Sequence, residues 1–166
     1  MSVGKALNDF GSYIVQQSRS NLTKQNKNVT KELYNSISYD YKVNPNSFEL
    51  SFYMEDYGTF VDKGVKGAKS SAKAPNSPYK YTNKRPPSRV FDKWSIQRGF
   101  AARDEKGRFL PRKTVNFLIA KSIYEKGIET TNFFTQPFER AFKRLPDELV
   151  EAYGLEVDTL LQTSLS

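Results

Sequence analysis

The chain has 166 residues and a mass of 19.0 kDa, the size of one domain. Only 37% of its residues are hydrophobic while 14% are aromatic, which predicts a modest core built from rings rather than a disordered chain. Cysteine and histidine are absent, which excludes disulfides, zinc–thiolate sites and most histidine-dependent hydrolase mechanisms. The net charge of +8 favours an acidic partner.

The N-terminal residues are predicted to form an amphipathic helix. Val3, Leu7, Phe10 and Ile14 recur at helical spacing, and the pattern fades into a polar run over residues 18–28. A short helical turn is expected near residues 30–33.

Residues 37–54 predict an antiparallel β-hairpin. Apolar or aromatic side chains alternate with polar ones over residues 37–43 and again over 48–54, and residues 44–47 (Asn-Pro-Asn-Ser) supply turn chemistry. Because an isolated hairpin is marginally stable in water, we expect helices, or strands from other subunits, to cover its apolar face.

The whole excess of positive charge lies in residues 63–89, which we call the basic segment. It has no acidic residue and eight basic ones: Lys63, Lys66, Lys69, Lys73, Lys80, Lys84, Arg85 and Arg89. Its glycine, proline and serine content predicts a long loop without a packed element. Such a loop is either a solvated, flexible insertion or an arm that orders against a phosphate backbone or a neighbouring subunit's acidic face. Tyr79 and Tyr81 supply rings able to stack on bases.

Short helices are predicted on both sides of the basic segment. Tyr57, Phe60 and Val61 are spaced for a single helical turn that ends at Gly64. Ser88 is expected to cap a second short helix, which ends at Gly99. A turn follows over residues 103–108.

The C-terminal third is predicted to be helical. The first helix has an apolar face formed by Val115, Leu118, Ile119 and Ile123. The next starts at residues 135–137 and is interrupted by Pro146. The last segment, residues 147–166, carries five acids that no base follows: Asp147, Glu148, Glu151, Glu156 and Asp158.

These elements predict a single α+β domain over residues 1–166. A hairpin or small antiparallel sheet is expected to pack against the N-terminal helix and the C-terminal helices, with the basic segment as a long loop. No apolar run is long enough to span a bilayer, so no membrane association is expected.

The sequence offers little chemistry for catalysis. Glu55, Asp56 and Asp62, with Lys63, have the residue types of a metal-dependent nuclease. These acids flank a short helical turn, however, and no strand pair is expected to bring them together. No phosphate-binding glycine motif occurs. We therefore expect no enzyme activity, no metal and no cofactor, and the nuclease is the least favoured hypothesis.

Four phenylalanines lie near the start of the helix at residues 135–145. Helical spacing favours core packing over a ligand pocket for Phe133, Phe134, Phe138 and Phe142. Phe133 and Phe134 precede the helix, so one of the two is expected to face a neighbouring chain.

Several motifs, taken in order, resemble the neck proteins of tailed bacteriophages, which are small head–tail connector or tail-completion proteins also called minor tail components. Residues 33–37 lead into the hairpin, residues 57–64 follow it before a Lys/Gly-rich loop, and residues 133–142 match the start of a late helix. The resemblance spans roughly residues 29–145. The motif residues are Tyr57, Gly58, Phe60, Val61, Gly64, Phe134, Pro137 and Phe138.

The resemblance implies a structural virion protein that forms a ring with copies of itself, with six as the expected number. Such a ring joins the head connector to the tail at the head–tail junction, surrounds the DNA channel and contacts other neck, connector and tail proteins. It would assemble in the cytoplasm of the host bacterium. The basic segment would face the DNA channel, with weak non-specific contact with DNA, or would pair with the acidic face of the next subunit. The alternative is a non-catalytic nucleic-acid-binding protein that uses the basic segment.

Overall fold

The structure is a computed structural model that describes residues 2–27 and 31–152, and its fold is α+β as predicted. Its chain forms two compact units, and neither unit is one continuous segment. Unit 1 comprises Met1–Lys24, Tyr34–Glu55 and Phe133–Ser166, and unit 2 comprises Gln25–Leu33 and Asp56–Asn132. The short helix α2 (Glu32–Ser36) contributes residues to both units.

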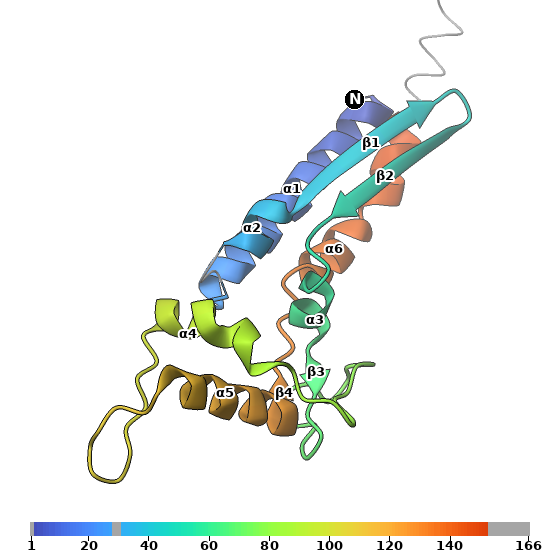
Figure 1. Ribbon diagram of the computed structural model, residues 1–166. Coiled ribbons are helices and arrows are strands. Elements are labelled where there is room, and N and C mark those ends of the chain that lie inside the picture. The colour runs from blue at the N-terminus through green and yellow to red at the C-terminus, as the bar shows by residue number, and fades with distance from the viewer. Residues whose placement is uncertain (1, 28–30, 153–166) are drawn as a thin grey trace, which may run out of the picture. The chain divides into compact units, whose positions relative to one another are not determined.

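Unit 1 pairs the hairpin with helices, as predicted. Its elements are α1 (Val3–Lys24), β1 (Ser38–Asn44), β2 (Ser47–Tyr53), α6 (Thr135–Phe142) and a further helical stretch over residues 145–152. The hairpin runs alongside α1 (Figure 1). Its register places Tyr41 opposite Leu50 and Val43 opposite Phe48, so the apolar residues of both strands share one face.

The core of unit 1 is built from rings. Phe10 of α1 meets Phe52 of β2 at 6.3 Å and Phe138 of α6 at 5.8 Å between ring centroids, both in edge-to-face contacts. Gly11 allows the helix to approach the strand, because a Cβ there would lie 2.3 Å from the ring of Tyr39. Helices of the same chain therefore cover the apolar face of the hairpin.

Helix α1 is longer than the apolar pattern predicts. The polar run after Val15 remains helical to Lys24, because Ser18 and Leu22 continue the buried stripe. Arg19 on the same stretch donates hydrogen bonds to the carbonyl oxygens of Tyr34 and Ile37. These contacts come from residues distant in the sequence, which a local pattern does not reveal.

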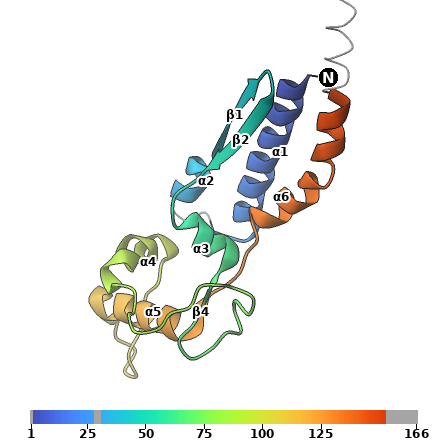
Figure 2. The same ribbon diagram turned by 90° about the vertical axis from the view of Figure 1, so that its right-hand side faces the viewer.

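Unit 2 consists of short elements, and Figure 2 shows α4 beside α5. The elements are α3 (Gly58–Lys63), β3 (Val65–Lys66), the 3₁₀ helix η1 (Ser88–Phe91), α4 (Asp92–Arg98), α5 (Arg112–Lys126) and β4 (Gly127–Ile128). The predicted turn at 103–108 is present: the Asp104 carboxylate accepts hydrogen bonds from the backbone N–H groups of Lys106 and Arg108.

Two local predictions in unit 2 are wrong. Ser88 does not cap a helix; it is the first residue of η1, and no side chain caps that element. In α5 the buried residues are Val115, Asn116 and Ala120, whereas Leu118 is 45% exposed. The buried face differs because it includes a polar residue, which an apolar pattern omits.

A polar network explains why Asn116 is buried. The Asn116 Oδ1 accepts a hydrogen bond of 2.8 Å from the Ser95 hydroxyl, and its Nδ2 donates to Asp92 at 2.9 Å. Arg112 donates to both carboxylate oxygens of Asp92, at 2.8 and 3.3 Å. The hydrogen bond from Asn116, and then the bond and charge of Arg112, hold the pKa of Asp92 below its ordinary value of 3.8.

We predict that Asp92→Asn lowers the free energy of unfolding at neutral pH. Because the pKa of Asp92 is lower in the folded chain, its stabilising effect is complete above pH 3.8 and is lost as the pH falls through the folded-state pKa. The difference between variant and wild type should therefore shrink at low pH in urea titrations. Asp147→Asn, at an exposed acid, is the control and should match wild type; a pH-independent loss for Asp92→Asn would contradict the prediction.

Candidate subunit and nucleic-acid interfaces

The basic segment is attached to unit 2 by backbone pairing. Its β3 pairs antiparallel with β4, with Val65 opposite Ile128 and Lys66 opposite Gly127. The chain then returns to the other side of β3: Lys66 N–H donates to the Tyr79 carbonyl and Tyr81 N–H donates to the Lys66 carbonyl, both at 2.9 Å. The prediction that this composition supplies no packed element is wrong, because the segment contains a strand with partners on both sides.

Small buried residues hold the rest of the basic segment against its own unit. Ala74 is fully buried, and Ser77 is 6% exposed while its hydroxyl donates to the Gly64 carbonyl at 2.7 Å. Lys73 accepts a hydrogen bond at its carbonyl from the Thr130 N–H. The segment is thus folded along its length, and its charges are displayed from a defined backbone.

Glycines make the β3–β4 approach close enough. A Cβ on Gly127 would lie 2.1 Å from the Val65 carbonyl oxygen, and one on Gly67 would lie 2.2 Å from the Glu125 carbonyl oxygen. Gly64 and Gly127 also have φ angles of 72° and 85°, which side chains of L-residues rarely adopt. Larger residues at these positions would force the strands apart.

The basic side chains point largely to solvent. Seven of the eight are exposed and Lys66 is half-buried. Lys69 lies 3.1 Å from Glu125, and its hydrogen bond is the main cause that lowers the pKa of that carboxyl. Arg85 lies over the Phe117 ring at 4.6 Å from the centroid. In the part of the chain that the structure describes, the other six form no ion pair.

The two tyrosines of the basic segment pack within unit 2. Tyr79 meets Phe60 edge-to-face at 4.9 Å, and Tyr81 contacts Tyr124 at 6.1 Å. Burial raises the pKa of the Tyr81 hydroxyl. Because both rings already have partners, their use as stacking platforms for bases would require them to leave these contacts.

Unit 1 carries the acidic counterpart. Asp147, Glu148 and Glu151 are exposed on the helical stretch 145–152, and among residues 2–27 and 31–152 none of them forms an ion pair. Glu156 and Asp158 lie outside the described residues.

The same helical stretch borders an apolar groove of about 510 Å³. The lining residues come from α1, the hairpin turn and the C-terminal helices: Val3, Phe48, Phe142, Leu145, Pro146, Leu149 and Val150. Three of them remain substantially open to solvent, with Phe48 and Phe142 each 50% exposed and Val150 73% exposed. Exposed apolar patches of this kind mark contact sites.

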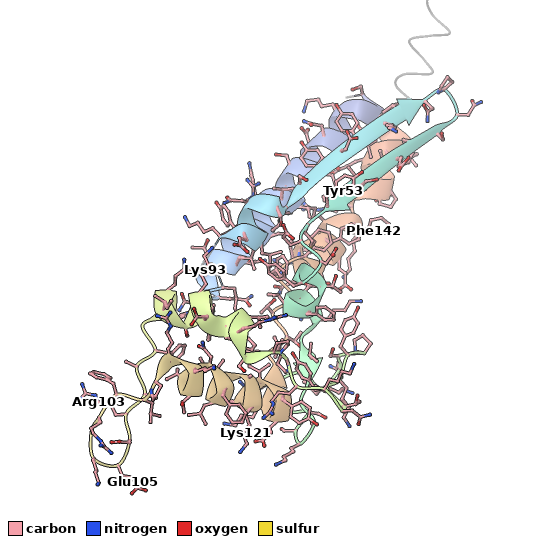
Figure 3. All side chains as sticks on the ribbon, in the orientation of Figure 1. Tyr53, Lys93, Arg103, Glu105, Lys121 and Phe142 are labelled. Carbon is pink, nitrogen blue, oxygen red and sulfur yellow. The ribbon has the colours of Figure 1, made fainter. Side chains whose placement is uncertain are left out.

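The predicted roles of the phenylalanines are partly wrong. Phe133 is fully buried and Phe134 stacks on Phe138 at 5.6 Å, so neither faces outward. Phe142, expected in the core, is the exposed member and is labelled in Figure 3. The helix ends at Phe142, so this residue lies beyond the core that the preceding turns build.

The motif residues occupy structural positions in both units. In unit 2, Gly58 is buried, Tyr57 and Phe60 are 40% and 42% exposed, and Gly64 ends α3 as predicted. In unit 1, Pro137 is buried in the first turn of α6, next to the half-buried Phe134 and Phe138. The motifs thus form element ends and packing contacts.

The acids of the nuclease hypothesis do not form a site. Glu55 belongs to unit 1, while Asp56 and Asp62 belong to unit 2. Asp62 is buried, and its carbonyl accepts hydrogen bonds from the N–H groups of Thr131 and Asn132. Over the described ranges, no group of three or more acidic side chains is arranged to hold a metal ion.

Comparison with protein-family models, with curated proteins and with solved structures finds no match to this chain. Among the described helices, none has the length and apolar character needed to cross a bilayer.

We predict that Gly127→Ala destabilises the chain far more than Gly107→Ala. Both glycines have positive φ angles, 85° and 78°, so both variants incur the left-handed strain of about 1–2 kcal/mol. Only Gly127→Ala adds a clash with the β3 backbone, since the space around Gly107 is open. Denaturant unfolding measures the two losses; equal losses would show that the close β3–β4 approach is not needed.

Proposed function

We propose that this chain is a non-catalytic structural subunit of the bacteriophage head–tail neck, which assembles with copies of itself into a ring around the DNA channel. The observation that carries the proposal is the open apolar groove of unit 1, whose Phe142 and Val150 have the exposure of contact residues rather than core residues. The motif resemblance supplies the family, and a second copy of the chain is the proposed occupant of the groove.

Charge separation supports contact between identical copies. The acids beside the groove have no partner among the described residues, and six basic side chains of the basic segment likewise form no ion pair there. A head-to-tail contact brings two different surfaces together and closes into a ring when the rotation permits. Opposite charges on the two surfaces would set the register and speed the encounter.

We predict that the double variant Phe142→Ser, Val150→Ser weakens self-association. Each substitution removes about 1.5 kcal/mol or more of apolar burial per contact, which corresponds to at least about tenfold in the dissociation constant. Analytical ultracentrifugation over a concentration series measures the change, and circular dichroism checks that the variant is folded. Tyr53→Ser alters a hairpin residue that is 55% exposed but does not line the groove, and it should assemble like wild type. An equal loss in both variants would contradict the proposal.

The alternative, a nucleic-acid-binding protein, is favoured by the exposed, ordered lysines of the basic segment. Lys73, Lys80 and Lys84 are exposed and form no ion pair in the described structure. Phosphates neutralised by such side chains release counterions, so binding would weaken steeply with salt.

We predict for that alternative that the triple change of Lys73, Lys80 and Lys84 to Ala reduces the slope of log K against log salt by about 0.9 per lost contact. The matched control replaces Lys106, Lys113 and Lys121, three exposed lysines of unit 2 outside the basic segment. DNA binding at several salt concentrations distinguishes the sets, and equal slopes would contradict the alternative. If the basic segment variant still binds DNA normally but assembles poorly, its charges serve subunit contact.

A further inference from the structure

Unit 2 contains a smaller pocket, of about 240 Å³, which shares no residue with the apolar groove. Its lining combines cationic, aromatic and aliphatic side chains: Lys27, Lys31, Leu33, Tyr57, Val61, Trp94 and Arg98. Three of these described residues are cations and none is an acid. The pocket is thus a concave site with a concentrated positive charge.

Arg98 has a fixed position in this pocket and a spare donor. One of its terminal nitrogens donates to the Asn26 carbonyl, and its guanidinium carbon lies 5.8 Å from the Trp94 ring centroid. Its Nε atom is buried and has no hydrogen-bond partner among the described atoms. A buried donor without an acceptor is unfavourable, so an anion that enters the pocket would improve the environment of this guanidinium.

Size and chemistry together define the ligand class. A volume of 240 Å³ is below the range of about 300–1,000 Å³ typical of sites for drug-sized ligands, so a small anion or one group of a larger molecule fits. Arginine and lysine are the usual donors to phosphate oxygens. The apolar Leu33, only 4% exposed, lowers the local dielectric and strengthens such contacts.

We propose that this pocket binds a phosphate group, held by Arg98, Lys27 and Lys31. The phosphate belongs either to a small phosphomonoester or to the phosphodiester backbone of DNA. The inference concerns unit 2 alone and does not depend on self-assembly or on the basic segment.

Trp94 provides a direct reporter, because it is the only tryptophan of the chain and lines the pocket. Inorganic phosphate, titrated into the full chain at constant ionic strength, should change the tryptophan emission and reach saturation. Chloride at the same ionic strength should not. No saturable change, or the same change with chloride, would overturn the proposal.

The decisive variant is Arg98→Ala, which should raise the half-saturating phosphate concentration at least about tenfold. Lys93→Ala is the matched control: it removes the same charge from the same helix, but Lys93 pairs with Glu32 at 3.3 Å and does not line the pocket (Figure 3). If the two variants shift the titration equally, the proposal fails.

A second variant keeps the test independent of folding. Lys27→Ala changes an exposed side chain, leaves the Arg98 contacts intact and should also weaken phosphate binding, by a smaller factor. Circular dichroism checks all variants. An unchanged titration for folded Lys27→Ala together with folded Arg98→Ala would overturn the assignment.

Two probes distinguish the sources of the phosphate. A nucleoside monophosphate tests a monoester, and a short single-stranded DNA without terminal phosphates tests the diester backbone. Arg98-dependent saturation with either probe supports the site and names its source; failure of both, with inorganic phosphate also silent, overturns it.

Discussion

The close backbone approach between β3 and β4 is the constraint on which the organisation of unit 2 depends. Gly67 and Gly127 allow carbonyl oxygens to occupy the space where a Cβ would otherwise lie, 2.2 and 2.1 Å away. This contact joins the start of the basic segment to the end of α5, across about sixty residues of sequence. It converts a glycine- and proline-rich stretch into a folded surface that presents its cations in a fixed arrangement.

Unit 1 is organised by a different principle, the packing of rings between one helix and one hairpin. Phe10, Phe52 and Phe138 meet edge-to-face and fill the space that a longer sheet would otherwise cover. Beyond them the apolar surface continues outward through Phe142 to Val150 and stays open. A core that is complete at one end and open at the other is the basis for inferring a contact between copies.

Periodicity in the sequence predicts the elements whose contacts are local. The alternation in 37–54 correctly gives the strands, the turn and the shared apolar face, because a hairpin pairs neighbouring residues. It misses the extension of α1 past Val15, the polar buried face at Asn116 and the strand in the basic segment. Each of these depends on a partner distant in the sequence: the carbonyls after α2, the Asp92 network and β4.

The candidate surfaces were accessible from sequence to different degrees. Clustering of charge identifies the basic segment and the acidic helix directly, since both are continuous stretches. The phosphate pocket is not visible in the sequence, because Lys27, Tyr57 and Arg98 come together only in the folded chain. The central claim remains that copies of this chain complete one another, and native mass spectrometry of the purified protein tests it most directly. The account predicts one closed oligomer of fixed copy number that persists on dilution, and a monomer at every concentration would contradict it.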